Sequence, residues 1–225
     1  MRIVAFGDVH QRPEQCGKIP GLDACDYLLV NGDLTNFGGR GAAARVIAAL
    51  RQFCPRVFAQ TGNLDRRSAS EFLAQEGIDL HGQARLLVKG GDSLMVIGLG
   101  GSNPTPFFTP NELSELALAR LLDQAWRQAR ALATDGANLP TLLLTHAPPH
   151  GTQLDRLKNG RHVGSKAVRA FIEQYQPSLC VCGHIHEAKG EDRLGATILF
   201  NPGAFAQGGW VEIDAEAGSV RAKLF

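Results

Sequence analysis

The sequence predicts an α/β fold in which parallel strands build much of the sheet structure. The pattern of apolar runs, the composition of the second half and the length of the chain each contribute to the predicted architecture. Short apolar runs alternate with helical stretches in the first half of the chain. The second half adds a hairpin and further strands, so it is richer in β structure. The 225 residues are enough for one sizeable core, so we expect a single domain over 1–225.

The first half of the chain alternates predicted strands and one predicted helix. The apolar runs predict strands over 2–6, 27–31 and 56–60. The alanine-rich stretch 41–53 carries apolar residues at helical spacing and is predicted to be a helix. Two apolar runs around Gly90-Gly91-Asp92 predict a hairpin over 84–101. This order predicts βαβ units followed by an antiparallel pair.

A loop over 102–110, rich in proline and polar residues, precedes the next predicted helix. Thr109 is placed to cap that helix, Pro110 suits its first turn, and Glu112 completes a capping box. We expect the helix to run to about Leu132. Later stretches predict strands over 141–146 and 178–184, a helix over 166–175, and β structure from 196 onward with a turn at 217–218.

Composition excludes several classes of protein. Lys and Arg number 23 and Asp and Glu 22, so a net charge of +1 gives no basic footprint for a nucleic-acid polymer. No apolar run is long enough to span a membrane, and the N-terminal run of five apolar residues is too short for a signal peptide. Five scattered cysteines fit reduced thiols. We therefore expect a cytoplasmic protein, with its oligomeric state open and a homodimer among the alternatives.

Polar side chains follow five of the apolar runs, where each predicted strand ends. They are Asp8, His10, Asp33, Asn63, His146, His184 and His186. Ligands of open α/β sheets bind beyond the carboxyl ends of the strands, so we expect these seven side chains to converge. A glycine directly precedes four of them, which lets the backbone turn sharply. The two histidine-containing i, i+2 pairs would point the same way in extended chain.

Such a cluster of acids and imidazoles needs a positive counter-charge, because clustered carboxylates repel one another. Divalent cations supply that charge. A set of nitrogen and oxygen ligands without a required thiolate suits Mn, Fe, Zn or Co better than Ca, and we favour Mn or Fe. Seven candidate ligands exceed what one tetrahedral ion takes, so the sequence favours two metals.

The blocks that carry these residues resemble, in order, those of the calcineurin-like metallophosphoesterase family. They read GDVH, NGDLTN, TGNLD, LLTHAPP and CGHIH, and they span residues 7 to 186. The stretches GDLTNFGG, GGSNPTP and THAPPHGT are most similar to a prokaryotic branch of small, stand-alone predicted phosphoesterases. The resemblance implies a four-layer α/β/β/α sandwich with two mixed sheets.

The resemblance also implies roles at the metals. Asp8, His10 and His186 would hold the first metal. Asn63, His146 and His184 would hold the second, and Asp33 would bridge both. The hypothesis that follows is in-line attack on phosphorus by a hydroxide bridging the two metals, with Asp33, Asn63 and His146 as catalytic residues. The expected reaction is hydrolysis of a small phosphoester substrate, with a phosphodiester favoured.

Leu64 stands where many relatives carry a histidine able to protonate the leaving group. Leucine supplies no proton, so we expect a preference for diesters or for esters with good leaving groups. His150, four residues after His146, is the nearest candidate for a replacement donor. Asp65 would then lack an imidazole partner, and we interpret it as a residue that supports the ligands or forms a turn.

Alternatives remain at several positions. A zinc site built on Cys180 and Cys182 is disfavoured, because buried free cysteine usually behaves as a small apolar residue. Phe107 and Phe108 either wall a substrate pocket or pack into the core. His81 and His162 are expected to be surface or structural residues without convergent neighbours. The alternative function is a binding or scaffold protein that keeps the fold but has weak catalysis.

Overall fold

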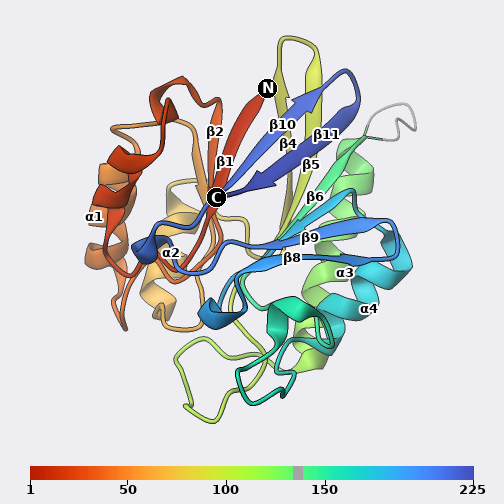
Figure 1. The fold of residues 1–225 in the computed structure, drawn as a ribbon. Helices are drawn as coiled ribbons and strands as arrows, with labels where there is room; N and C mark the ends of the chain where they lie inside the picture. Colours follow the sequence, from red (N-terminus) through yellow and green to blue (C-terminus); the bar gives the residue numbers. More distant parts are fainter. Residues whose placement is uncertain (134–138) are drawn as a thin grey trace.

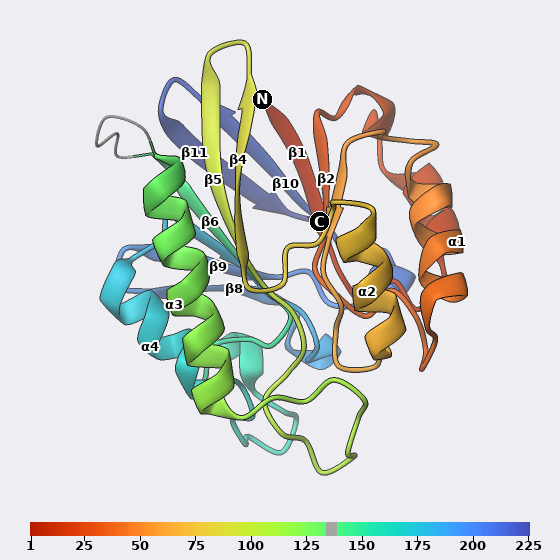
Figure 2. The same ribbon diagram turned by 180° about the vertical axis from the view of Figure 1, so that it is seen from behind.

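The computed structural model describes residues 1–133 and 139–225. Two β-sheets stack face to face, and a pair of helices covers the outer face of each sheet (Figures 1 and 2). This is the four-layer α/β/β/α sandwich with two mixed sheets that the family resemblance implies.

The first sheet has the strand order β11-β10-β1-β2-β3. Its strands are β1 (Arg2–Phe6), β2 (Tyr27–Val30), β3 (Val57–Ala59), β10 (Val211–Glu216) and β11 (Ser219–Leu224). The β1, β2 and β3 strands run parallel, as the βαβ pattern predicts. The C-terminal hairpin joins antiparallel to β1, so the sheet is mixed.

The second sheet has the order β4-β5-β6-β7-β9-β8. Its strands are β4 (Gln83–Lys89), β5 (Asp92–Leu99), β6 (Thr141–Thr145), β7 (Leu179–Val181), β8 (Gly190–Leu194) and β9 (Thr197–Asn201). The four central strands are parallel, and β4 and β8 are antiparallel edge strands. The predicted hairpin around Gly90-Gly91-Asp92 is confirmed by the pairing of β4 with β5.

Apolar side chains fill the three interfaces between the four layers. The α1 helix (Arg40–Leu50) and α2 helix (Arg67–Gln75) pack on the first sheet, and α3 (Glu115–Leu132) and α4 (Lys166–Tyr175) pack on the second. Residues such as Ile3 and Leu29 from one sheet meet Val96 and Leu144 from the other. Short 3-10 helices lie at Pro13–Lys18, Leu22–Ala24, Gln153–Asp155, His186–Ala188 and Phe205–Gln207. The second helix, α2, was not predicted from the sequence.

The start of the third helix differs from the prediction. The Thr109–Glu112 pair does form, with the Thr109 backbone N–H donating to Glu112 Oε1 at 2.7 Å. It closes a turn of a loop instead of a helix, because the loop backbone bonds to neighbouring segments. Asn111 N–H donates to Asn63 O, and Leu113 N–H donates to Ser102 O. The α3 helix begins at Glu115, where Ser114 Oγ accepts from Ala117 N–H.

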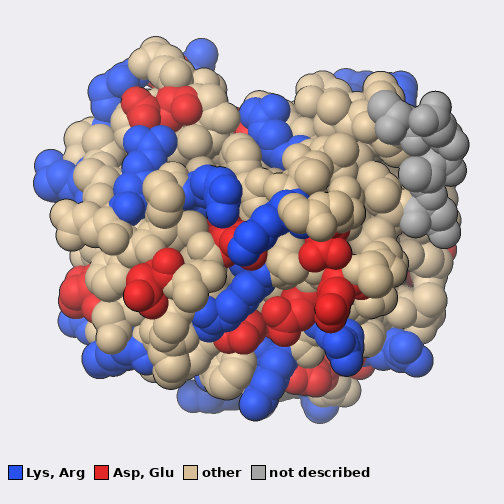
Figure 3. Space-filling view, turned by 90° about the horizontal axis from the view of Figure 1, so that it is seen from above, with Lys and Arg blue, Asp and Glu red and all other residues tan. Residues whose placement is uncertain are grey.

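The surface and the cysteines agree with the composition. All five cysteines are unpaired and buried, as expected for reduced thiols. Within 1–133 and 139–225, no helix is both long and apolar enough to cross a bilayer. On the face seen in Figure 3, Lys and Arg alternate with Asp and Glu, so this face shows no continuous basic patch.

Glu115 ties the N-termini of α3 and α4 together. Its carboxylate accepts hydrogen bonds from Ser165 Oγ and from the backbone N–H groups of Lys166 and Ala167, at 2.7, 3.0 and 2.8 Å. The backbone N–H groups of a first helical turn lack partners within the helix, so an acidic acceptor stabilises them. This contact therefore fixes the start of α4 against the start of α3.

We predict that Glu115→Ala lowers the free energy of unfolding by about 1–2 kcal/mol, because three donors lose their acceptor. Denaturant unfolding measures the change. Glu173→Ala is the matched control, since Glu173 makes only an exposed ion pair with Arg169 on the same helix; we expect a change of at most about 0.5 kcal/mol. Equal losses in the two variants would contradict the role assigned to Glu115.

Candidate metal centre

The seven side chains singled out at strand ends come from both sheets. Asp8 and His10 follow β1, Asp33 follows β2, and Asn63 follows β3. His146 follows β6, and His184 and His186 follow β7. Asp8, Asp33, Asn63 and His146 are all buried. The carboxyl ends of parallel strands from both sheets lie at one edge of the sandwich, and five of the seven side chains form two compact groups of ligand atoms there.

The backbone is strained at this edge. Among residues other than glycine, Asp8, His10, Asp33 and His184 have positive φ angles of 55°, 48°, 45° and 66°. Each such residue costs about 1–3 kcal/mol and persists only where the surroundings impose it. Strain of this kind tends to gather at functional sites. Because His184 is left-handed and a 3-10 helix begins at His186, this segment is not extended, so the reasoning from i, i+2 spacing was wrong here.

Two of the predicted glycines allow carboxylates to approach the backbone closely. A Cβ atom on Gly62 would lie 2.1 Å from Asp33 Oδ1. A Cβ atom on Gly183 would lie 2.6 Å from Asp8 Oδ2. Real Cβ atoms do not come this close, so any larger residue would displace Asp33 or Asp8. Here glycine is required by space more than by an unusual backbone angle.

The first ligand group contains Asp8, His10 and His186, which offer ligand atoms that all lie within 4.8 Å of one another. His186 Nε2 lies 2.8 Å from Asp8 Oδ1 and 3.5 Å from His10 Nε2. This is the trio that the family resemblance assigns to the first metal.

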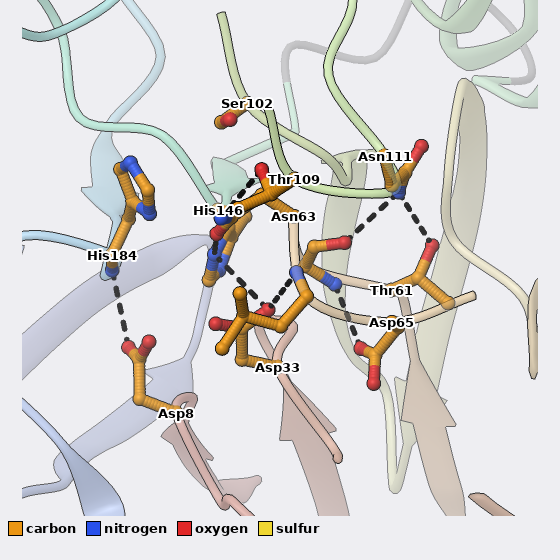
Figure 4. A network of polar contacts seen from close by, with 12 residues as sticks. Asp8, Asp33, Thr61, Asn63, Asp65, Ser102, Thr109, Asn111, His146 and His184 are labelled. Carbon is orange, nitrogen blue, oxygen red and sulfur yellow. Dashed lines mark hydrogen bonds and ion pairs between the residues drawn. The ribbon is translucent and has the colours of Figure 1, made fainter. Parts of the chain in front are cut away.

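The second ligand group contains Asp8, Asp33 and His146, again within 4.8 Å of one another. Asn63 adds its Oδ1 atom, 3.0 Å from His146 Nε2 (Figure 4). Asp33 Oδ1 lies 3.6 Å from the same nitrogen. The two groups share Asp8, whereas the resemblance gives the bridging position to Asp33. That bridging role stays a prediction.

His184 is brought to the site in a different way. Its backbone N–H donates to Asp8 Oδ2 at 3.1 Å. Figure 4 shows its ring on the opposite side of the backbone from Asp8. The ring centroid lies 5.2 Å from that of His146. His184 therefore belongs to neither compact group of ligand atoms, and its role as a ligand stays a prediction.

Hydrogen bonds orient Asn63 and His146 so that acceptor atoms face each other. Thr109 Oγ donates to Glu112 Oε1, so it accepts from Asn63 Nδ2 at 3.0 Å, and this leaves Asn63 Oδ1 facing His146. The carbonyl of Asn31 lies 3.1 Å from His146 Nδ1 and can only accept, so Nδ1 carries the proton. In the neutral ring, Nε2 then offers a lone pair to the site.

The donor set therefore fits a cation. Asn63 Oδ1, His146 Nε2 and an ionised Asp33 are all electron-pair donors, and this geometry leaves no proton between them. Sequence reasoning missed the part played by Asn31 and Thr109. Thr109 drew attention only as a helix cap, and the Asn31 contribution comes from its backbone, which leaves no signal in the sequence.

The charges at the site also favour a bound cation. Burial, together with the neighbouring charges of Asp8 and Asp65, raises the pKa of Asp33 well above its usual value. Burial also raises the pKa of Asp8, but the hydrogen bond from His186 and the nearby imidazoles outweigh it and bring the value to about 2. Burial lowers the pKa of His146 to about 3, so this ring is neutral near physiological pH. A cation would relieve the repulsion that opposes ionisation of Asp33.

Asp65 holds two of the site loops together. Its buried carboxylate accepts from the backbone N–H groups of Leu34, Thr35 and Gly62 at 3.0, 2.9 and 3.0 Å. The hydroxyl of Thr35 donates to it as well, at 2.7 Å. Asp65 thus joins the loop that carries Asp33 to the loop that carries Asn63. This agrees with its interpretation as a supporting residue.

Leu64 contributes through its backbone. Its N–H donates to Asp33 Oδ1 at 2.9 Å, which helps to fix the carboxylate. Its half-buried side chain has no group that could exchange a proton with a substrate. A leucine can therefore fill this position without weakening the support of Asp33.

The structure decides between the alternatives for the remaining candidate residues. Cys180 and Cys182 are buried, and neither joins a ligand group within the described residues, so the cysteine zinc site gains no support. Phe107 and Phe108 are 80% and 90% exposed, so they do not pack into the core. His81 accepts from Gly100 N–H and is structural, as expected.

For His162 the expectation was wrong. Its Nδ1 lies 2.7 Å from Asp155 Oδ1, and its ring centroid is 6.1 Å from that of His150. The spacing of Asp155 and His150 in the sequence does not reveal the turn that brings them beside His162.

We predict that Mn²⁺ binding to the metal-free protein releases protons and weakens as the pH falls. The raised pKa values of Asp33 and His186 mean that both groups retain protons at higher pH than usual, and both must lose them to bind a cation. Titration calorimetry in buffers of different ionisation enthalpy measures the release. Asp33→Asn should release fewer protons, and a release of zero by the unaltered protein would contradict this account.

Comparison with known proteins gives the family. The model of the calcineurin-like phosphoesterase family matches residues 1–188. Uncharacterized protein MJ1162 of Methanocaldococcus jannaschii is 33% identical over 211 residues, which cover 90% of this chain and 88% of that protein.

Two solved structures share the fold. TT1561 of Thermus thermophilus has a TM-score of 0.69 at 18% identity, covering 99% of this chain and 97% of that one. A structure described as a novel archaeal phosphodiesterase has a TM-score of 0.51 at 12% identity, covering 100% of both chains. On the match of the family model and of MJ1162, this chain belongs to the calcineurin-like phosphoesterase family.

Proposed function

We propose that this protein is a phosphodiesterase that hydrolyses small phosphodiesters with two transition-metal ions bound at the candidate metal centre. The observation that carries the proposal is that Asn63 Oδ1 and His146 Nε2 face each other as electron-pair donors with no proton between them, beside the buried carboxylate of Asp33. Asp8, His10 and His186 form a second set of donors directly beside them.

In this proposal the ligands divide as the family resemblance implies. Asp8, His10 and His186 would hold one ion. Asn63, His146 and His184 would hold the other, and Asp33 would serve both. Mn or Fe is favoured over Zn or Co. A bound metal pair would supply Lewis-acid neutralisation of the phosphoryl oxygens and would lower the pKa of water that acts as the nucleophile.

The side chains of the protein have three tasks in such a reaction. Asp8 and Asp33 supply the negative charge that retains the cations. His146 stays neutral, because burial lowers the pKa of its ring, and so it keeps a lone pair available. The backbone N–H of Leu64 and the amide contact between Asn63 and Thr109 keep the ligands in place before substrate arrives.

The preference for diesters follows from position 64. Leu64 gives no proton to a departing oxygen, so the leaving group must be acidic or must take its proton from another side chain. The archaeal phosphodiesterase that shares the fold is in keeping with a diester substrate, although its likeness extends to the fold alone. The near-zero net charge favours a small substrate over a nucleic-acid polymer.

We predict that the Mn²⁺-loaded protein hydrolyses bis-p-nitrophenyl phosphate faster than p-nitrophenyl phosphate. The release of p-nitrophenolate from each compound, compared as kcat/KM, measures the preference. Faster turnover of the monoester would contradict the diester assignment. Absence of both bound metal and hydrolysis would favour the alternative, a scaffold protein that keeps only the fold.

Asp33→Asn should lower the metal-stimulated kcat/KM for the diester by at least about 10²-fold, because an amide brings no negative charge to the cations. Asp214→Asn is the matched control, since Asp214 is exposed on β10 and touches none of the site residues; it should keep full activity. Full metal-dependent turnover by Asp33→Asn would show that the proposed centre is not where the reaction takes place.

A further inference from the structure

A cavity of about 630 Å³ has in its wall His184, one of the seven strand-end side chains. The segments that line it are the loop 103–107, the loop 157–164 and His184 with Ile185, together with Glu115, His150 and Lys166. Its volume lies within the usual range for small-molecule sites, about 300–1,000 Å³. None of the residues in the two compact ligand groups lines this cavity.

One wall of the cavity carries an imidazole held by a buried carboxylate. Asp155 has no exposed surface, and its oxygens accept from the backbone N–H groups of Gly151, Thr152 and Gly164 at 3.0, 2.9 and 2.9 Å. His162 Nδ1 completes the set at 2.7 Å. Burial raises the pKa of Asp155, but the bonds from His162 and the backbone outweigh it, so the pKa is lowered and the group stays ionised.

This contact fixes which nitrogen of His162 can react. An ionised carboxylate only accepts hydrogen bonds, so Nδ1 must carry a proton. Nε2 is therefore the nitrogen that gains and loses a proton, as in other histidines oriented by a carboxylate. The position of His162 is also fixed by its bridge to Arg156 and by the bond from Val163 N–H to Asp155 O.

His150 is the weaker candidate for this chemistry. It lines the same cavity, with its ring centroid 6.1 Å from that of His162. Within the described residues, however, its ring makes no hydrogen bond that would set its tautomer. Arg161, Lys166 and Glu115 are the other charged groups that line the cavity.

We propose that His162, oriented by Asp155, protonates the leaving-group oxygen of a phosphodiester whose leaving group occupies this cavity. This inference rests on the proposed function. As the phosphorus–oxygen bond breaks, the leaving oxygen keeps the electron pair and takes the proton from His162 Nε2. The nucleophilic water oxygen forms the new bond to phosphorus and releases its proton to solvent, and His162 takes up one proton from solvent in turn, so the protons balance.

This assignment supplies the proton donor that Leu64 cannot provide. A donor on the 157–164 loop replaces the missing imidazole from the side of the leaving group. Esters of poorly acidic alcohols and phenols then become substrates, because their oxygen no longer has to depart as an anion. A proton donor of this kind contributes about 10²–10⁴-fold to the rate for such leaving groups.

The test is a series of methyl aryl phosphodiesters whose phenols range from p-nitrophenol to unsubstituted phenol. We expect His162→Gln to change kcat/KM for the p-nitrophenyl ester by less than about 3-fold and to lower it for the phenyl ester by about 10²-fold. The dependence of rate on leaving-group pKa therefore steepens. His150→Gln, the matched variant in the same cavity, should shift the whole series in parallel.

A second measurement does not depend on turnover. Nitrogen NMR of the metal-free protein with labelled histidine should show His162 protonated at Nδ1 and titrating at Nε2, and Asp155→Asn should remove that preference. Three results would each overturn the inference. The first is an equal loss of kcat/KM across the ester series in His162→Gln. The others are a steeper dependence of rate on leaving-group pKa in His150→Gln instead, and a His162 ring protonated at Nε2 and not at Nδ1. No hydrolysis of any ester by the unaltered protein would overturn the proposed function, and this inference with it.

Discussion

The arrangement of this site depends on two buried carboxylates, Asp8 and Asp33, that lie within reach of a common ligand position. Two negative charges in a buried place repel each other, and neither is solvated by water. Imidazoles from the other sheet balance Asp8. Asp33 gains no such balance from the described residues, and Asp8 and Asp65 both oppose its ionisation. A cation bound beside Asp33 would supply the positive charge that favours its ionised form.

That single requirement explains features that otherwise look costly. Four left-handed residues and two glycines without room for a Cβ atom bring the carboxylates against the turning backbone. Asp65 uses a buried charge to hold two loops in register. The left-handed residues cost stability, and together these features hold the oxygens and nitrogens of the candidate ligands where a cation would contact them.

Most of the strands, and the place of the seven polar side chains directly after them, could be predicted because both follow from local patterns; β8 was not predicted. Apolar runs mark buried strands, and polar residues directly after them must lie at the carboxyl edge. The four-layer arrangement came from the family resemblance, since the pairing of β10 with β1 joins segments about two hundred residues apart and no periodicity encodes it.

The failures share one physical cause. Thr109 and Glu112 have the composition of a helix cap, but the loop they belong to finds its backbone partners in Asn63 and Ser102. The two side chains do interact as the motif predicts, but hydrogen bonds to distant segments hold them in a loop instead of at the start of a helix. His162 was overlooked because its carboxylate partner is defined by a turn, and the orientation of His184 depends on a single left-handed residue.

The candidate ligands follow strands of both sheets, and this has a mechanical consequence. Asp8 and His186 are in contact although 178 residues separate them, and Asn63 meets His146 across 83. An ion at this edge would join strands that are otherwise held together by the apolar layer between the sheets and by hydrogen bonds such as those from Gln60 to Leu99 and Leu144. Without the ion, the like charges of Asp8 and Asp33 would work against those contacts, so this edge is where loss of metal would weaken the sandwich most.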